Sequence, residues 1–147
     1  MSKKYTVDEP FDVSDFMPGT LPDGALFGVG VDLSEVAKVA RACRGAGFRR
    51  QVFAPLELEA FVDGDVVDAE GLALAFAYKE AFYKALGTGQ RLGMLFHEIA
   101  GPPAAPSGTL HLTGRTAEVA QALGVKRIDA GASLRGDAAL AWVFLFG

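Results

Sequence analysis

Two carboxylates stand at positions where an acidic side chain is unfavourable unless it meets a cation. Asp32 ends a short apolar run, ALFGVGVD, that is typical of a strand, and Glu80 lies midway along a largely apolar helix predicted over residues 70–86. A buried carboxylate is costly without a partner. Magnesium takes oxygen ligands, usually one or two carboxylates, and completes its shell with water and phosphate oxygens. Asp32 and Glu80 are therefore a candidate magnesium site.

Each of these acids also has an interpretation that needs no metal. Asp32 could lie at a helix N-terminus, where the helix dipole favours a negative charge. Glu80 could form an ion pair with Lys84, which follows four residues later on the same helix. The spacing of the residues leaves these alternatives open.

Two lysines flank the helix glutamate and could bind phosphate. Lys79 and Lys84 carry ammonium groups, which are good point-charge partners for phosphate oxygens, although both could equally be surface residues. The GTG run at 87–89 lacks the Lys-Ser/Thr of a phosphate-binding loop, and Leu33 stands where a dinucleotide loop beginning at Gly28 needs its third glycine. The sequence also has no G-x-S-x-G elbow, so it does not support hydrolase-type nucleophilic chemistry.

A group of basic side chains, called here the basic cluster, precedes this helix. Three of its five members recur at helical spacing, and the members are Lys38, Arg41, Arg44, Arg49 and Arg50. Such a cluster is suited to docking an acidic partner, and a solvated helix face is the alternative. The net charge of −4 gives no support for binding nucleic acid.

The bulk composition indicates one soluble domain. The chain has 147 residues, of which 50% are hydrophobic, and this is enough for a single core. No apolar stretch approaches the roughly 20 residues that a membrane span needs. The start of the chain lacks the apolar segment of a signal peptide. We therefore expect a cytoplasmic protein with no membrane partner, whose single cysteine, Cys43, is a buried thiol.

The first elements are predicted from the positions of proline, glycine and capping residues and from the spacing of hydrophobic residues. Residues 1–24 combine prolines, glycines and acids, so they are predicted to be a tail in front of a domain over 25–147. After the strand, Ser34 is a plausible N-cap of an amphipathic helix that closes at Gly45 and Gly47. A short helix is expected after Pro55.

The second half is predicted to be richer in strands. The long helix ends at Gly87, a glycine in a C-cap position, and it is apolar around most of its circumference, which indicates burial. Later elements are predicted as a strand at 94–99, a turn at 101–108, a strand at 109–112, a helix at 115–123 and strands at 126–133 and 138–146. The last strand is apolar on both faces and should be central. Helices that come early and strands that come late indicate an α+β fold.

Four segments together resemble the successive blocks of the holo-acyl-carrier-protein synthase family of phosphopantetheinyl transferases. They are FGVGVDLSEVAKV, FRRQVFAPLELEAF, FAYKEAFYKALGTG and SGTLHLTGRTAEVAQALGV, and the likeness runs from about Ala25 to the C-terminus. The block around Lys79 and Glu80 is its most specific part. The resemblance implies an antiparallel sheet packed on a long helix, and a homotrimer with coenzyme A lying between neighbouring subunits.

The resemblance also implies roles for individual residues. Asp32 and Glu80 would hold Mg²⁺ on the coenzyme A pyrophosphate, with Lys84 as a third catalytic residue touching the phosphates. A serine of an acyl carrier protein or polyketide carrier domain would attack the β-phosphate and release 3′,5′-adenosine bisphosphate, and the basic cluster would bind that carrier. The remaining residues expected to bind coenzyme A are Lys79, Gly87, Thr88, Gly89 and Ser133.

This chain departs from the family pattern at positions expected to hold the nucleotide of coenzyme A. Ala75 replaces the usual arginine, and PAAPSGTL replaces the segment that normally reads G-K-P-x-I. The run from Ser133 to Ala139 is about two residues short and lacks the family's histidine and tyrosine. The alternative function is therefore an AcpS-like carrier-binding module, or a repurposed enzyme, that no longer uses coenzyme A.

Overall fold

The structure is a computed structural model that describes residues 24–102 and 107–147. The predicted tail over residues 1–24 lies almost wholly outside the described residues, as does part of the predicted turn at 101–108. None of the helices in the described part of the chain has the length and apolar character needed to cross a membrane.

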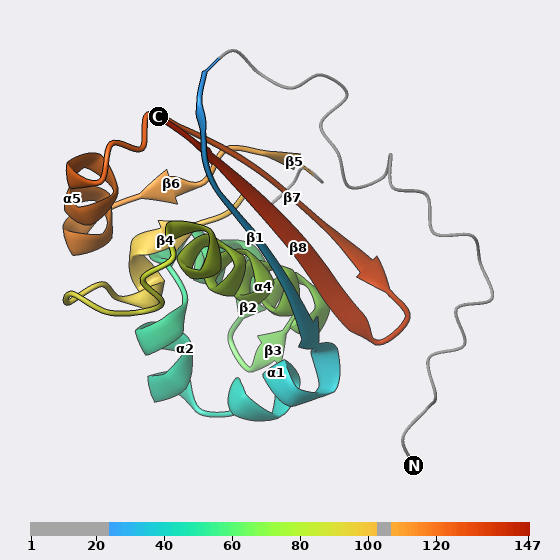
Figure 1. The fold of residues 1–147 in the computed structure, drawn as a ribbon. Coiled ribbons are helices and arrows are strands. Elements are labelled where there is room, and N and C mark those ends of the chain that lie inside the picture. Colours follow the sequence, from blue (N-terminus) through green and yellow to red (C-terminus); the bar gives the residue numbers. More distant parts are fainter. Residues whose placement is uncertain (1–23, 103–106) are drawn as a thin grey trace.

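A four-stranded antiparallel sheet forms one layer of the molecule (Figure 1). Its strands run in the order β1 (Leu26–Glu35), β8 (Ala138–Phe146), β7 (Arg127–Arg135) and β5 (Ser107–Gly108). β8 is paired along its length on both sides, which explains why its sequence is apolar on both faces. The prediction that the last strand is central is therefore confirmed.

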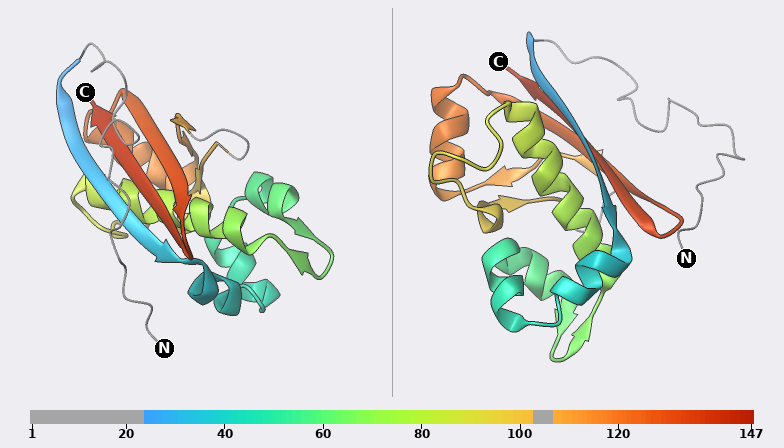
Figure 2. Two further views of the ribbon diagram at one scale, coloured as in Figure 1. Left: turned by 90° about the vertical axis from the view of Figure 1, so that its right-hand side faces the viewer. Right: turned by 60° about the horizontal axis from the view of Figure 1, so that its bottom comes forward.

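The long helix α4 (Ala69–Leu86) lies across one face of this sheet and packs against β1, β8 and β7 (Figure 2). It begins where the Asp68 side chain accepts a hydrogen bond from the Gly71 N–H at 3.0 Å, which satisfies one free donor of the first turn. It ends at Gly87, whose φ of +77° is the left-handed conformation that glycine adopts easily. The predicted helix and its glycine cap are both confirmed.

Three short helices cover one end of α4. They are α1 (Val36–Ala42), α2 (Ala46–Val52) and α3 (Pro55–Phe61), and the small hairpin β2 (Val62–Asp63) with β3 (Val66–Val67) leads from them into α4. The helix expected to close at Gly45 and Gly47 is instead two helices that break just before Ala46. Cys43 lies at this break and is buried, as expected.

The prediction that Ser34 caps a helix was wrong. β1 continues through Ser34, which pairs with Ala139, and the first helix starts only at Val36. Asp32 is therefore inside a strand and not at a helix N-terminus, so the helix dipole does not explain its charge. Pairing with β8 extended the strand beyond its apolar part.

The remaining elements form a small lobe beside the end of α4. They are a 3₁₀ turn (Phe96–Glu98), β4 (Ile99–Ala100), β6 (His111–Leu112) and α5 (Gly114–Ala122). Of the strand predicted at 94–99, only Ile99 belongs to a strand, β4. Phe96–Glu98 form a 3₁₀ turn instead, which the Glu98 carboxylate stabilises. That carboxylate accepts hydrogen bonds from the Leu95 N–H at 2.7 Å and from the first turn of α5. The α+β class is confirmed, and these elements pack around one core.

Candidate active site

Close packing of β1 on α4 brings three predicted site residues together. A Cβ at Gly28 would lie 2.0 Å from the carbonyl oxygen of Ala85, and one at Gly30 would lie 1.9 Å from that of Ala81. Only glycine permits such an approach of two backbones. The next residue on the same face of β1 is Asp32, so its side chain also points toward α4.

The carboxylate of Asp32 is held on both of its oxygens. Ser34 Oγ donates to Oδ2 at 2.9 Å, and Lys84 Nζ donates to Oδ1 at 2.8 Å. Lys84 Nζ also donates to the Val31 carbonyl oxygen at 3.3 Å. The Asp32 side chain is 12% exposed and that of Lys84 is 54% exposed. The carboxylate is therefore fixed in place, while the ammonium faces solvent and is available to a ligand.

Glu80 lies beside this pair and feels its charge. Partial burial raises the pKa of the Glu80 carboxyl, the negative charge of Asp32 raises it further, and the ammonium of Lys84 partly offsets both effects. The two carboxylates are thus close enough to repel each other. The ion pair made by Lys84 goes to Asp32 on β1, and not to Glu80 on its own helix as the local alternative proposed.

The donor set at this point fits magnesium. The described residues contain no group of three or more His, Cys, Asp or Glu side chains that could hold a metal. Asp32 and Glu80 would supply two carboxylates to a metal bound here. A closed zinc site needs four protein ligands, whereas Mg²⁺ is commonly bound by two carboxylates together with water and substrate phosphates. A divalent cation would also relieve the repulsion that raises the pKa of Glu80.

The assignment of Lys79 to phosphate binding was wrong. Its side chain is fully buried, and its ammonium forms an ion pair with Glu57 at 2.5 Å and donates to the Ile99 carbonyl oxygen. The Phe53 ring lies 5.7 Å away. Burial lowers the pKa of Lys79, and the Glu57 carboxylate opposes this shift. Lys79 therefore joins α3, α4 and β4 and has no exposed face for a ligand.

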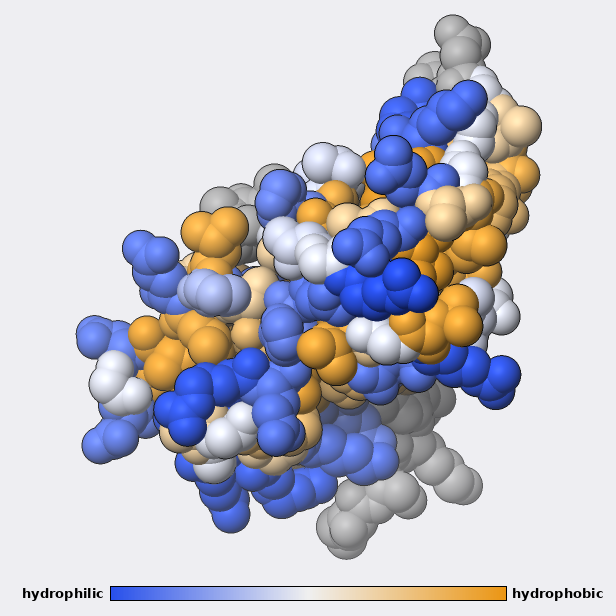
Figure 3. Space-filling model, turned by 90° about the vertical axis from the view of Figure 1, so that its left-hand side faces the viewer, coloured by the Kyte–Doolittle hydropathy of each residue, from blue (hydrophilic) through white to orange (hydrophobic). Residues whose placement is uncertain are grey.

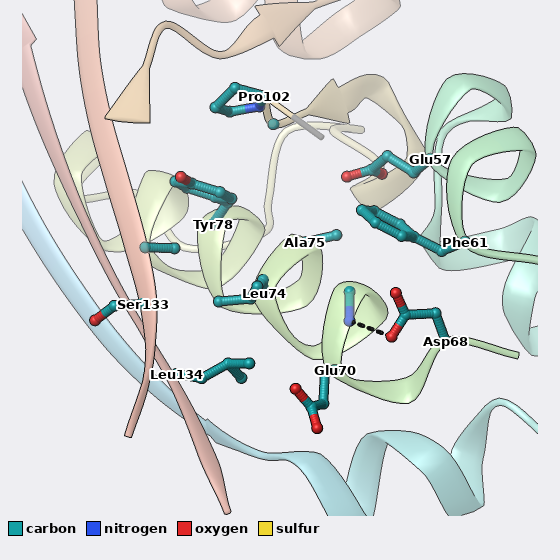
Figure 4. A pocket seen from close by; sticks show the side chains of 13 residues that line it. Glu57, Phe61, Asp68, Glu70, Leu74, Ala75, Tyr78, Pro102, Ser133 and Leu134 are labelled. Carbon is teal, nitrogen blue, oxygen red and sulfur yellow. Dashed lines mark hydrogen bonds between the residues drawn. The ribbon is translucent and has the colours of Figure 1, made fainter. Parts of the chain in front are cut away.

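The other residues expected at the coenzyme A site lie apart from Asp32 within one subunit. Gly87, Thr88 and Gly89 form a loop directly after α4, where the Thr88 hydroxyl donates to the Gly89 carbonyl oxygen at 2.9 Å. Ser133 pairs with Leu140 in β7, and its hydroxyl points away from α4 (Figure 4). It lies on the opposite face of the sheet from Asp32.

The basic cluster lies mostly on the surface of α1 and α2. Lys38, Arg41, Arg44 and Arg50 are exposed. Lys38 forms a surface ion pair with Glu35 at 3.4 Å, while half-buried Arg49 donates from Nη1 to the Cys43 carbonyl oxygen at 3.0 Å. The break between the helices spreads the cluster over two helices instead of one stripe.

A feature that the sequence analysis missed is the outer face of the sheet, which α4 does not cover. Val29, Val31 and Leu33 on β1 are 47%, 53% and 53% exposed, and their partners on β8 are Phe144, Trp142 and Leu140. The signal was present, because the large apolar residues of β1 alternate with Gly28, Gly30 and Asp32. By contrast, the side that carries α5 mixes hydrophilic and hydrophobic groups (Figure 3).

Comparisons with known proteins agree with this fold. The chain belongs to the 4′-phosphopantetheinyl transferase superfamily, whose family model matches residues 28–143. Within that class it is similar to the holo-[acyl-carrier-protein] synthase of Hydrogenovibrio crunogenus, with 36% identity over 121 residues that cover 80% of this chain and 94% of the relative. The expected family is therefore confirmed.

Solved structures of this enzyme type have the same fold. The holo-[acyl-carrier-protein] synthase of Neisseria meningitidis superposes with a TM-score of 0.70 at 29% identity, covering 84% of this chain and all of that one. The coenzyme A complex of the synthase from Chronobacterium ammoniagenes gives a TM-score of 0.65 at 29% identity, covering 84% of this chain and 98% of that one. The predicted fold of an antiparallel sheet packed on a long helix is thus confirmed.

Proposed function

We propose that this chain transfers 4′-phosphopantetheine from coenzyme A to a serine of an acyl carrier protein or polyketide carrier domain, in a magnesium-dependent reaction. One observation carries the assignment of the site. Lys84 Nζ lies 2.8 Å from Asp32 Oδ1, and its positive charge partly offsets the raised pKa of Glu80. Family membership supports the reaction, and favours it over a carrier-binding module that no longer uses coenzyme A.

In this proposal Asp32 and Glu80 hold Mg²⁺, which supplies orientation of the pyrophosphate and compensation of its charge. Ser34 keeps the Asp32 carboxylate in position through its 2.9 Å hydrogen bond. Lys84 is 54% exposed and places its ammonium against a phosphate oxygen. The loop of Gly87, Thr88 and Gly89 follows α4 directly, and its part in binding coenzyme A rests on the family resemblance.

The carrier serine hydroxyl forms a bond from its oxygen to the β-phosphorus of coenzyme A and releases its proton to solvent. The bond from that phosphorus to the bridging oxygen breaks, and 3′,5′-adenosine bisphosphate leaves with this oxygen. Negative charge therefore develops on the leaving group, next to the exposed ammonium of Lys84. Stabilisation of charge that appears in the transition state is a main source of catalysis in phosphoryl transfer.

The carrier protein docks on the basic cluster in this proposal. Four of its five members are exposed on α1, α2 and the turn between them, soon after the strand that carries Asp32. Opposite charges on two surfaces accelerate their encounter and fix their orientation. A cytoplasmic location is part of the proposal, because both coenzyme A and its carrier acceptors are found there.

We further propose that the enzyme is a homotrimer assembled through the outer face of the sheet. Val29, Val31 and Leu33 are exposed on this face, and a contiguous exposed apolar area marks an interaction surface. Ser133 points from the same face, so it could meet coenzyme A only where a neighbouring subunit supplies the rest of the site. The position of Ser133 therefore supports binding of coenzyme A between neighbouring subunits.

The proposal is tested by incubating the protein with apo carrier protein, coenzyme A and Mg²⁺ and measuring the mass of the carrier. We expect addition of phosphopantetheine to the wild type, and loss of this addition on chelation with EDTA and in Asp32→Asn and Glu80→Gln. Glu118→Gln, an exposed acid on α5, is the matched control and should retain activity. Carrier binding without a change of mass would refute the transferase.

A further inference from the structure

A cavity of about 480 Å³ lies between α3, the first half of α4 and β7 (Figure 4). Its lining includes positions that the family resemblance assigns to the nucleotide of coenzyme A. Ala75 stands where the family usually has an arginine, Ser133 is an expected coenzyme A residue, and Pro102 directly precedes the altered PAAPSGTL segment. In the proposed substrate site, this cavity is therefore the part that receives the nucleotide.

The helix α4 carries both this cavity and part of the candidate metal site. Ala75 lines the cavity, and Glu80 follows five residues later on the same helix. An α-helix rises about 1.5 Å per residue, so these two residues are about 7.5 Å apart along the helix axis. A nucleotide spans such a distance, so a donor whose pyrophosphate lies at Glu80 and Lys84 can place its nucleoside in the cavity.

The charges at this cavity do not favour a phosphate group. Its described lining contains three acids and no Lys, Arg or His. Glu57 is buried and paired with Lys79, so its charge is compensated. Asp68 and Glu70 are exposed at the rim, and within residues 24–102 and 107–147 neither forms an ion pair. A ligand that enters the cavity therefore meets two uncompensated negative charges.

The N-terminus of α4 does not offer a phosphate site either. The first turn of a helix attracts anions through its free N–H groups and the helix dipole. Here the Asp68 carboxylate accepts the Gly71 N–H at 3.0 Å, and Glu70 lies in the same first turn. Figure 4 shows both carboxylates on one side of the cavity. Acidic groups of the chain itself thus occupy the place that an anion would take.

Acidic side chains at a nucleotide are suited to a free sugar hydroxyl. A hydroxyl donates a hydrogen bond to a carboxylate. Dinucleotide-binding folds use an acid where a ribose hydroxyl is free and an arginine where it carries a phosphate. A phosphate monoester has a charge of about −2 at neutral pH. Asp68 and Glu70 would repel such a group, and Ala75 supplies no cation to hold it.

We propose that the donor best used by this chain is coenzyme A without its 3′-phosphate (dephospho-coenzyme A), and that Asp68 and Glu70 determine this specificity. The inference rests on the proposed transferase function. The bonds that form and break are the same for both donors. The carrier serine oxygen binds the β-phosphorus, the serine proton passes to solvent, and the leaving group is AMP in place of 3′,5′-adenosine bisphosphate.

The mass of the carrier, measured with each donor in turn, tests the preference. Both donors add the same 4′-phosphopantetheine, so one mass change reports on either reaction. We expect kcat/KM to be about tenfold or more higher for dephospho-coenzyme A, with the difference in KM, because repulsion of the 3′-phosphate weakens binding. Added salt should reduce the difference by screening this repulsion.

The two donors also separate this inference from the function on which it rests. Equal or better use of coenzyme A would overturn the donor preference and leave the proposed transferase function unaffected. Transfer from neither donor would refute the transferase function itself.

Two exposed acids test the location of the determinant. Glu70→Lys replaces a rim carboxylate with a cation, and should raise kcat/KM for coenzyme A about tenfold relative to dephospho-coenzyme A. Glu59→Lys makes the same change on the surface of α3, outside the cavity lining, and should leave the ratio of the two donors unchanged. An unchanged ratio in Glu70→Lys would show that the cavity does not select the donor.

The two leaving nucleotides give the same comparison without turnover. AMP and 3′,5′-adenosine bisphosphate differ only in the 3′-phosphate. In calorimetric titrations of the full chain with Mg²⁺ present, we expect AMP to bind about tenfold or more tightly than the bisphosphate. Tighter binding of the bisphosphate would overturn the inference, because it would show that the site attracts the 3′-phosphate.

Discussion

Gly30 lies so close to α4 that a Cβ at this position would be 1.9 Å from the carbonyl oxygen of Ala81. This contact sets the distance between β1 and the helix. Asp32 follows Gly30 on the same face, and its ion pair with Lys84 depends on that distance. Gly28 and Gly30 of β1 thus have a structural role in forming the candidate active site, although they have no side-chain group that could bind a substrate.

The variant Gly30→Ala tests this relationship. The added methyl group has no space against the Ala81 carbonyl, so β1 must move away from α4, and we expect a loss of unfolding free energy of about 1–3 kcal/mol or more. Transferase activity should fall by more than the loss of folded protein explains. Gly45→Ala is the matched control, because nothing lies within 4 Å of its added Cβ. Urea unfolding measures the stability of both variants, and the mass of the carrier measures their transferase activity. Only Gly30→Ala should lower both.

Removing the ammonium of Lys84 should impair substrate binding and leave stability nearly unchanged. The pair with Asp32 is half-exposed on the lysine side, and exposed ion pairs contribute about 0–1 kcal/mol. In Lys84→Met we therefore expect an unfolding curve close to that of the wild type, together with a raised KM for coenzyme A and a lowered kcat. Lys126→Met, at another exposed lysine, is the control. Unaltered kinetics in Lys84→Met would exclude Lys84 from the site.

Features set by local sequence were predicted well. The helix α4 has a run of Ala and Leu residues without internal glycine or proline, followed by Gly87, and both its extent and its cap were found. β8 was recognised as central because both of its faces are apolar. Asp32 and Glu80 were singled out because acids inside apolar elements are unusual, and the structure places Glu80 within reach of the charge of Asp32, while their role as a metal pair stays a prediction.

Features set by contacts distant in sequence were not predicted. Lys79 is adjacent to Glu80, and no local pattern shows that Glu57, 22 residues earlier, returns to pair with it in the core. The extension of β1 through Ser34 depends on pairing with β8 more than one hundred residues later. The face on which Ser133 lies follows from the register of β7, which the sequence does not specify.

The buried pair of Lys79 and Glu57 should be important for stability and not for substrate binding. Lys79→Met leaves a carboxylate buried without its cation, and breaking a buried pair in this way costs about 3–5 kcal/mol. The double variant Glu57→Gln, Lys79→Met removes the stranded charge and should recover part of that loss. Urea unfolding measures both effects. The KM of the folded fraction for coenzyme A should not change. A selective rise in this KM would show that Lys79 takes part in substrate binding.

Charge reversal in the basic cluster should weaken use of the carrier protein alone. Arg41→Glu and Arg44→Glu change exposed side chains, so the fold should be retained. We expect the KM for the carrier to rise and its dependence on salt to decrease, because the attraction between opposite charges is lost. The KM for coenzyme A should stay constant. Arg115→Glu on α5 lies outside the cluster and is the control. An equal effect of all three variants would show a general charge effect and not docking.

A polar residue on the outer face of the sheet should dissociate the proposed trimer. The wild type is expected to have three times the 15.5 kDa mass of one chain in light scattering. Val31 is 53% exposed in the single subunit, so Val31→Asp should be tolerated by the subunit fold and should still prevent assembly by placing a charge in an apolar interface. Leu123→Asp, at an exposed leucine after α5, should remain trimeric. Because Ser133 lies on the same face, dissociation should also raise the KM for coenzyme A. A monomeric wild type that is fully active would refute both the trimer and a coenzyme A site shared between subunits.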